Sequence, residues 1–346
     1  MSQLLSEPMI AETSELAGKH VLALSGGVGG AKLALGLSKV MPATQLTVVA
    51  NTADDFNHLG LSISPDLDTV MYTLAGMNNQ QQGWGLANES WNTMDALETL
   101  GGDSWFRLGD RDIATHLERS QRLSRGDSLS TVTDYLSKKL GVAHRILPMT
   151  NDSVRTQITT DAGLLAFQEY FVREQCEPAI IGYSFAGIDT AKPTKALMEL
   201  LNSDQLGAII ICPSNPFVSV DPILMLSGVR EAMLKSRAPV IAVSPIVAGQ
   251  AIKGPAAKMM KELNLPVTAK AVAEFYGELL SGFVLDATDS DLACSIENDG
   301  PKVACVPTVM KTLADRIQLA RDVLSFAEQL TQNSNETKRM TSGENR

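Results

Sequence analysis

Two segments decide the fold: VLALSGGVGGAKLALGL at Val21–Leu37 and LTVVANTADDFNHLGLSISPDLDTVMYTL at Leu46–Leu74. The first predicts a buried strand, Val21–Leu24, that runs through four glycines into an apolar helix, Lys32–Val40. The second predicts another strand, Leu46–Ala50, which ends in a turn containing two aspartates. This order of strand, glycine loop, helix and strand is typical of a parallel α/β sheet that binds ligand at the carboxyl ends of its strands.

The glycine loop predicts a bound phosphate group, most simply that of a nucleotide. Glycine lacks a Cβ, so backbone N–H groups can approach a ligand closely, and the start of a helix favours an anion. The lysine amine lies one helical turn further on, within reach of a diphosphate. The predicted phosphate-binding residues of this segment are Gly26, Gly27, Gly29, Gly30 and Lys32.

The loop departs from both common nucleotide-binding patterns. In the dinucleotide pattern G-x-G-x-x-G, Lys32 replaces the third glycine. In the P-loop pattern, Ala31 replaces the glycine before the lysine, and Leu33 replaces the hydroxyl that binds Mg²⁺. A nicotinamide oxidoreductase and a P-loop kinase are therefore disfavoured, and a tight turn without a ligand is the remaining alternative.

Carboxylates gather soon after the second predicted strand. Asp54 and Asp55 lie in the turn, and Asp66 and Asp68 follow behind Pro65. Clustered carboxylates beside a phosphate site suggest a hard cation such as Mg²⁺. In an extended segment the last two carboxylates would point to one side. The alternative is that Asp68 caps the start of a helix.

Composition and charge exclude several classes of protein. The chain has 346 residues, 44% of them hydrophobic, and a net charge of −10. We therefore expect no general nucleic-acid binding, because phosphate backbones require clustered Lys and Arg. No apolar run is long enough for a membrane span and the N-terminus carries no secretory signal, so no membrane partner is expected. Four scattered cysteines suggest buried thiols in the cytoplasm.

Strand and helix signals alternate along most of the chain, which predicts a Rossmann-like, doubly wound and mostly parallel α/β sheet. The further strands predicted are Ala179–Ile181, Ala208–Cys212, Val240–Ser244 and Gly282–Asp286. The further helices predicted are Pro222–Leu234, Pro255–Leu263 and Val272–Leu280. We expect a single domain over residues 19–335, a mainly helical insertion over about 70–165, and flexible termini at 1–18 and 336–346.

Two further loops follow predicted strands at the same edge of the sheet. Pro213–Ser219 and Ser244–Gly249 are small, polar and punctuated by proline. Their Ser and Asn side chains can donate to phosphate, or they can cap helices. The predicted phosphate contacts here are Ser214, Asn215 and Ser244.

The insertion carries a charged cluster, Phe106–His116, and the predicted helix Asp112–Arg122 begins within it, where Asp110 or Asp112 can cap the helix. A solvated helix start with salt bridges is the simplest interpretation of this cluster. His116 is interpreted as structural or exposed. His58, beside the acidic turn, is the better functional candidate of the two histidines.

These motifs together resemble the 2-phospho-L-lactate transferase (CofD) family, over roughly residues 21–330. The motifs that carry the resemblance are Gly26–Lys32, Asn51–Asp55, Ser64–Tyr72, Leu108–His116, Leu147–Met149, Phe167–Tyr170, Cys212–Ser219 and Val243–Gly249. The resemblance implies a Rossmann-like homodimer with a helical insertion. It also implies a Mg²⁺-dependent transfer of a phosphorylated three-carbon acid from a guanosine-diphosphate-activated donor to the deazaflavin Fo, with release of GMP, in the biosynthesis of coenzyme F-420.

The resemblance also implies roles for individual residues. The family's Fo-contacting positions correspond to Asp68 and Arg107, the latter often a lysine in related enzymes. Mg²⁺ near Asp54, Asp66 and Asp68 would neutralise the diphosphate, and Asp68 could orient or deprotonate the attacking hydroxyl. Asp68 and Asp54 are therefore the predicted catalytic residues. A non-catalytic sugar-nucleotide-binding regulator is the alternative function, and no residue indicates which three-carbon acid is transferred.

Overall fold

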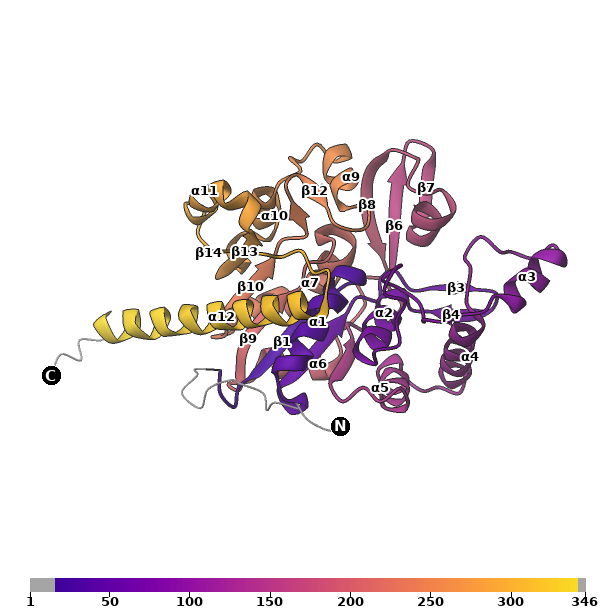
Figure 1. Cartoon of the computed structure of the whole chain (residues 1–346), viewed down its shortest axis with the longest axis horizontal. Coiled ribbons are helices and arrows are strands. Elements are labelled where there is room, and N and C mark those ends of the chain that lie inside the picture. The colour runs from indigo at the N-terminus through magenta and orange to yellow at the C-terminus, as the bar shows by residue number, and fades with distance from the viewer. Residues whose placement is uncertain (1–15, 342–346) are drawn as a thin grey trace.

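A seven-stranded parallel sheet forms the centre of the molecule (Figure 1). The computed structural model describes residues 16–341, and the side chains of residues 16–333. From one edge to the other, the strands are β14 (Lys302–Val306), β13 (Gly282–Asp286), β10 (Val240–Val243), β9 (Leu206–Ile211), β1 (His20–Ser25), β2 (Leu46–Ala50) and β5 (Arg145–Pro148).

Helices cover both faces of this sheet, which confirms the predicted doubly wound fold. Alternate residues of each strand point to opposite faces, so Val21 and Ala23 join one apolar core and Leu22 and Leu24 the other. The first core includes α1 (Val28–Val40), α2 (Pro65–Leu74), α5 (Leu129–Lys139) and α12 (Leu313–Thr341). The second includes α6 (Lys195–Leu201), α7 (Asp221–Met225), α8 (Val229–Lys235), α9 (Ala256–Glu262) and α10 (Ala269–Tyr276).

The predicted insertion of about 70–165 is wrong at its C-terminal end. Arg145–Pro148 is strand β5 of the main sheet, paired with β2, so the inserted helices α3 (Asn92–Thr99), α4 (Asp110–Ser124) and α5 end before it. A separate antiparallel sheet follows, made of β7 (Gly163–Ala166), β6 (Arg155–Thr160) and β8 (Ile180–Ala186). The strand predicted at Ala179–Ile181 therefore belongs to this small sheet and not to the main one.

Three other predictions about helices need correction. The helix predicted at Pro222–Leu234 is two helices, because Gly228 adopts a left-handed φ of +81° between α7 and α8. The helix predicted to end at Leu280 ends at Tyr276, before Gly277. Helix α12 continues to Thr341, where we expected flexible chain from 336, because no Gly or Pro interrupts it. Residues 1–15 and 342–346 of the predicted flexible termini lie outside the described residues.

Short elements complete the chain. They are the hairpin β3 (Phe56–His58) and β4 (Leu61–Ile63), the hairpin β11 (Ile246–Val247) and β12 (Gln250–Ala251), and α11 (Ala293–Glu297). Single turns of tighter or wider helix occur at Ala43–Gln45, Glu169–Arg173, Pro216–Val220, Gly277–Leu279 and Ala287–Leu292. Among residues 16–341, no helix is both long enough and apolar enough to span a membrane.

The order of the strands fixes the place of a ligand site. The chain proceeds from β1 through β2 to β5 on one side, then returns to β9 and continues through β10, β13 and β14 on the other. The crevice between the carboxyl ends of β1 and β9 is therefore a topological switch point, where open α/β sheets bind their ligands. The glycine loop leaves β1 at this point, and Pro213–Ser219 leaves β9.

Candidate functional site

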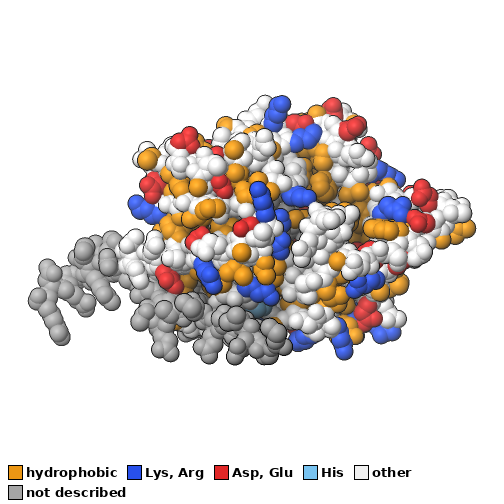
Figure 2. Space-filling view, viewed as in Figure 1, with side chains coloured by type: hydrophobic (Ala, Val, Ile, Leu, Met, Phe, Trp, Pro, Cys, Tyr) orange, Lys and Arg blue, Asp and Glu red, His pale blue; other side chains and the backbone are white. Residues whose placement is uncertain are grey.

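A cavity of about 570 Å³ opens at the switch point. Its walls come from the loops after β1, β2, β9 and β10, from α2 and α4, and from two segments at 82–85 and 252–256. In the space-filling view, Lys and Arg side chains gather near the middle of the face shown, beside hollows lined by apolar side chains (Figure 2). A cavity of this volume is large enough for small-molecule substrates.

The four glycines divide into two groups. Gly27 and Gly29 line the cavity, as predicted for phosphate-binding residues, and α1 begins at Val28 directly between them. Gly26 and Gly30 do not line it. They instead allow close packing against the β9 loop, because a Cβ on Gly26 would lie 2.5 Å from Ser219 Cβ and one on Gly30 would lie 2.6 Å from Ser214 Oγ.

Positive charge is concentrated beside the start of α1. Lys32 lines the cavity, and the charges of Arg316 and Lys253, together with a larger effect of burial, lower the pKa of its amine. No carboxylate of the described residues forms an ion pair with Lys32. Lys32 and Lys253 both line the cavity and repel one another, so a bound anion would stabilise this part of the site.

The two polar loops contribute side chains to the same wall. Ser214, Asn215 and Ser244 all line the cavity. Ser214 Oγ accepts a hydrogen bond from the Gly26 N–H at 2.9 Å, and Asn215 Oδ1 accepts one from the Phe217 N–H at 3.0 Å. Ser244 Oγ bonds within its own turn, to Ile246. The structure thus brings these residues to the site, where they also hold their loops in place.

Asp54 and Asp66 form a pair of carboxylates around one amide. Asn51 Nδ2 donates to Asp54 Oδ2 and to Asp66 Oδ2, each at 3.0 Å. Burial raises the pKa of Asp54 well above its usual value, and the charge of Asp66 adds to the rise. Burial likewise raises the pKa of Asp66, to about 6. Asp54 Oδ1 is buried and has no hydrogen-bond partner among the described residues.

This pair fits a divalent cation, but the predicted set of three ligands does not form. Helix α2 begins at Pro65, so Asp66 and Asp68 lie about 200° apart around its axis and not on one side of a strand. Across the described part of the chain, no three His, Cys, Asp or Glu side chains converge on a point that could hold a metal. Asp54 and Asp66 remain as candidates, and Mg²⁺ is commonly held by one or two carboxylates together with substrate phosphates.

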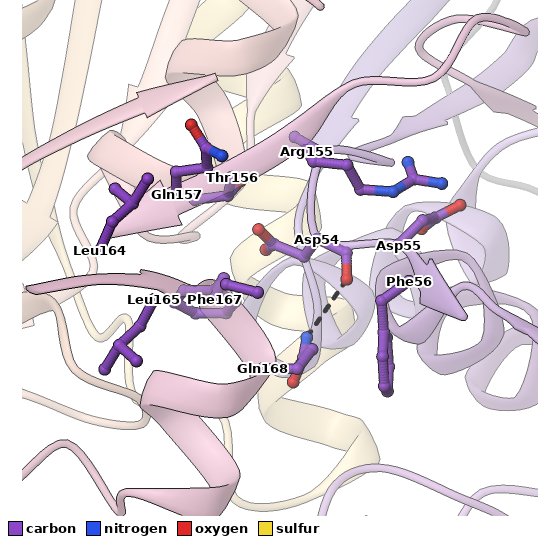
Figure 3. A pocket seen from close by; sticks show the side chains of 12 residues that line it. Asp54, Asp55, Phe56, Arg155, Thr156, Gln157, Leu164, Leu165, Phe167 and Gln168 are labelled. Atoms are coloured by element: carbon purple, nitrogen blue, oxygen red, sulfur yellow. Dashed lines mark hydrogen bonds between the residues drawn. The ribbon is translucent and has the colours of Figure 1, made fainter. Parts of the chain in front are cut away.

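A second, smaller cavity of about 180 Å³ lies on the other side of the acidic turn, against β6 and β7 (Figure 3). Asp54, Phe167 and Gln168 line both cavities and separate them. Gln168 Nε2 donates to the backbone oxygen of Asp54 at 3.4 Å. Asp55 points away toward Ser64, whose hydroxyl donates to it at 2.7 Å, and burial raises the pKa of Asp55 to about 8.

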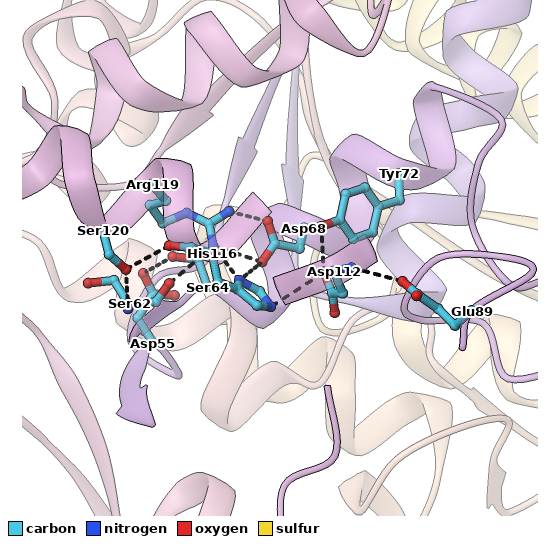
Figure 4. Close-up of polar contacts among 10 residues, drawn as sticks. All are labelled: Asp55, Ser62, Ser64, Asp68, Tyr72, Glu89, Asp112, His116, Arg119 and Ser120. Atoms are coloured by element: carbon cyan, nitrogen blue, oxygen red, sulfur yellow. Dashed lines mark hydrogen bonds and ion pairs between the residues drawn. The ribbon is translucent and has the colours of Figure 1, made fainter. Parts of the chain in front are cut away.

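Asp68 occupies a different part of the cavity, in a network on α2 and α4 (Figure 4). Both of its oxygens accept hydrogen bonds from the guanidinium of Arg119, which is buried. Asp68 does not cap its helix, because Ser64 is the N-cap residue and the Asp68 N–H donates to the Ser64 carbonyl. The alternative interpretation of Asp68 as a cap is therefore wrong.

His116 and Tyr72 extend this network along the cavity wall. His116 is buried, with Nδ1 3.1 Å from Arg119 Nη1 and Nε2 3.3 Å from Asp112 Oδ1. The Tyr72 hydroxyl donates to the same Asp112 oxygen at 2.6 Å. Burial alone would raise the pKa of Asp112, but its contacts with His116 and Tyr72 outweigh burial and lower it.

Arg107 lies at the edge of the cavity, on a wall rich in aromatic side chains. Its guanidinium is half exposed, 2.6 Å from Asp95 and over the ring of Trp91. The apolar side chains of this wall are Ile63, Phe106, Phe167, Phe171 and Val172. The rings of Phe167 and Phe171 are stacked at 5.6 Å with an angle of 7° between them. Such a wall suits a flat ring system.

Sequence reasoning favoured the histidine that lies away from the cavity, and it missed two cations. His116 lines the cavity, whereas His58 lies outside its lining, among Phe56, Trp105 and Phe106. Arg119 was not singled out, although its position on the buried side of an amphipathic helix is a signal that could have identified it. Lys253 follows no motif, so only the fold reveals its place near Lys32.

Comparisons with known proteins identify the family of the chain. The model of the family described as 2-phospho-L-lactate transferase CofD matches residues 21–300. A protein named phosphoenolpyruvate transferase from Kitasatospora aureofaciens is 41% identical, over 91% of this chain and 100% of its own. One named 2-phospho-L-lactate transferase from Methanosarcina acetivorans is 38% identical, over 88% of this chain and 98% of its own. Both names describe transferases, and neither supports a non-catalytic regulator.

Solved structures agree on the fold. A crystal structure of a UPF0052-family protein from Bacillus halodurans covers 88% of this chain and 98% of its own, with a TM-score of 0.56 and 15% identity. That likeness extends over the whole α/β arrangement described above. From the family match and the close relatives together, the chain belongs to the 2-phospho-L-lactate transferase CofD family.

Proposed function

We propose that the protein transfers a phosphorylated three-carbon acid from a guanosine-diphosphate-activated donor to the deazaflavin Fo, releasing GMP. The observation that carries this proposal is that one cavity joins an anion site to an aromatic wall. Gly27, Gly29 and Lys32 lie at the first, and Phe106 and Phe171 at the second. A nucleotide diphosphate and a flat acceptor can therefore lie side by side.

The reaction needs two substrates held in line. A side-chain hydroxyl of Fo attacks the phosphorus that carries the acid, a new P–O bond forms, the P–O bond to GMP breaks, and the hydroxyl proton passes to Asp68 or to water. Positioning and charge stabilisation carry most of such a transfer. Backbone N–H groups at Gly27 and Gly29 and the amine of Lys32 would hold the diphosphate. Asp68 would accept a hydrogen bond from the attacking hydroxyl.

Asp54 and Asp66 are the residues that would hold Mg²⁺, in place of the three carboxylates expected from the sequence. When bound, the ion would neutralise charge on the diphosphate. The Asn51 amide orients both carboxylates toward one site. Burial raises the pKa of each carboxyl group, and none of the ion pairs among the described residues involves either one, so a bound cation would offset this unfavourable burial.

The relatives carry two names, which differ in the acid transferred. Phosphoenolpyruvate and 2-phospho-L-lactate are therefore the first two acids to test in the activated donor, and phosphoglycerate is the third. The family resemblance further supports a cytoplasmic homodimer as part of this proposal. Both substrates are small molecules, so the reaction requires neither nucleic acid nor membrane.

Incubation of the protein with Fo, Mg²⁺ and each activated acid tests the proposal. We expect release of GMP, measured by chromatography, and a deazaflavin heavier by the transferred phosphoacid, measured by mass spectrometry. Excess EDTA should stop both. Absence of GMP with all three donors would refute the proposed reaction, and undiminished transfer in EDTA would refute the role of the metal.

A further inference from the structure

Arg119 is a large, fully buried side chain that the proposed reaction does not yet use. It projects from α4 toward Asp68 and is not among the residues that line the cavity. Its Nη1 donates to Asp68 Oδ2 at 3.0 Å, and its Nη2 donates to the other oxygen. Two parallel bonds between planar groups fix the direction of the carboxylate. Asp68 therefore has its orientation set from behind by Arg119.

The same guanidinium also fixes His116. Arg119 Nη1 lies 3.1 Å from His116 Nδ1, and a guanidinium only donates, so Nδ1 must be the acceptor. The proton of a neutral imidazole is then on Nε2, which faces Asp112 at 3.3 Å. Asp112 in turn accepts from the Tyr72 hydroxyl. One side chain thus orders two groups of polar atoms on the cavity wall.

These two groups face the same space. Asp68, Tyr72, Asp112 and His116 all line the cavity. The Tyr72 proton is already donated to Asp112, so a ligand with several hydroxyl groups on a flexible chain could donate both to the carboxylates and to the Tyr72 hydroxyl oxygen. To hold such a chain in a single arrangement, the side chains of the polar wall must themselves be fixed in place.

We propose that Arg119 is a positioning residue for the hydroxyl-bearing chain of the acceptor substrate, acting through Asp68 and His116. This inference rests on the proposed function, because it assumes that the acceptor lies against Asp68. Arg119 does not touch the substrate. Its effect should therefore appear in acceptor binding, and not in binding of the nucleotide.

Arg119→Lys tests the proposal, because lysine keeps the charge and loses the paired geometry. We expect the KM for Fo to rise about tenfold or more, on the scale of a lost charge-assisted hydrogen bond. Affinity for GDP, measured by calorimetry, should change less than about twofold. Arg122→Lys is the matched control, since Arg122 is on the same helix and pairs with Glu118 near the surface. The control should leave both constants unchanged.

A double-mutant cycle with Asp68→Asn distinguishes positioning from general support of the fold. The variants are Arg119→Gln, Asp68→Asn and the pair together, which leaves no buried ion unpaired. Because Asp68 is one of the two groups through which Arg119 acts, adding Arg119→Gln to Asp68→Asn should lower Fo affinity much less than Arg119→Gln does in otherwise wild-type protein. GDP binding confirms that each variant is folded.

Fo affinity is read from quenching of deazaflavin fluorescence, which needs no turnover. Unchanged Fo affinity in Arg119→Lys would overturn the inference, as would an equal loss with and without Asp68. Wild-type protein that binds Fo but transfers nothing would refute the proposed reaction and leave this inference standing. Wild-type protein that binds no deazaflavin would refute both.

Discussion

Asp54 and Asp66 each place a carboxylate oxygen 3.0 Å from the same nitrogen, Nδ2 of Asn51. The first follows strand β2 and the second lies in the first turn of helix α2, so the fold brings together two acids from different elements. Two carboxylates at one amide, one buried and the other half-buried, cannot both carry charge without cost. The pair is therefore a source of instability in the free protein that a bound cation would remove.

The first prediction concerns pH and Asp66. Its pKa is raised to about 6 in the folded protein, above an ordinary value near 3.8, so the protonated form is favoured by folding. The contribution of Asp66 to the free energy of unfolding is therefore fully present below about pH 4, and it is lost as the pH rises through about 6. Asp66→Asn should therefore raise the melting temperature of metal-free protein at pH 7.5 by a few degrees, and should abolish Mg²⁺-dependent transfer.

Thermal unfolding of both proteins between pH 4 and 8 checks this prediction. The difference in melting temperature should grow with pH and shrink when Mg²⁺ and GDP are added together. Asp204→Asn, in an exposed turn, serves as the control and should show neither trend. If Asp66→Asn were less stable than wild type at pH 7.5, the charged carboxylate of Asp66 would be stabilised by the protein itself without a metal, and the prediction would be wrong.

The second prediction concerns the anion site. Lys32→Ala should weaken GDP binding by about tenfold, the scale of one lost charge-assisted contact, and should leave Fo binding unchanged. Stability should not fall, because the amine is repelled by Lys253 and Arg316 in the free protein. Calorimetry with GDP measures the effect. Lys39→Ala, at the exposed end of the same helix, is the control, and equal GDP affinity in the two variants would place Lys32 outside the nucleotide site.

The third prediction concerns the acceptor side. Arg107→Ala should raise the KM for Fo and spare GDP binding, because Arg107 lines the cavity beside the aromatic wall. The rise should be modest, about threefold to tenfold, since the guanidinium is half exposed and already paired with Asp95. Steady-state kinetics with varied Fo measure it, with Arg125→Ala as an exposed control. If Arg107→Ala lost affinity for GDP and kept normal affinity for Fo, Arg107 would belong to the nucleotide site, and this prediction would be wrong.

The fourth prediction concerns Asp68. Asp68→Asn should lower the transfer rate by roughly two orders of magnitude, on the scale of a lost acid–base or orienting group. It should also lower the melting temperature, because Arg119 stays buried with half of its charge pair removed. A helix cap would predict no such loss of stability. Rates are measured well below the melting temperature, with Asp134→Asn on α5 as the control. Near-normal turnover would remove Asp68 from the mechanism.

The features that the sequence predicted well are local ones. The strand at Leu46–Ala50, the glycine loop and the acidic turn depend on neighbours within a few residues, and the structure places them at one site. Continuous apolar runs marked the central strands, because helices cover both faces of the sheet and bury every residue there. Predicted and observed elements therefore agree where the local sequence pattern and the burial in the folded protein indicate the same secondary structure.

The features that the sequence missed depend on distant contacts. Strand β14 lies at one edge of the sheet and all of its residues are half-buried or exposed, and β5 is a strand of four residues at the other edge. Each has an apolar run of four residues or fewer, which is a weak strand signal. The pairing of Asp68 with Arg119 joins two helices across the insertion, and spacing along the chain does not report it. The direction of the Asp66 side chain depends on the start of α2 at Pro65. The extended conformation expected from the sequence therefore predicted the wrong direction.

The place of β1 beside β9 has a consequence for the newly made chain. Val21 pairs with Leu46 on one side and with Ala208 on the other, so one edge of β1 stays open until the ribosome has made β9. The proposed nucleotide site includes Pro213 and Ser214 as well as the glycine loop. A nascent chain that stops before them exposes an apolar strand edge and lacks part of this proposed site. Binding of GDP as proposed would therefore assist folding only late in synthesis.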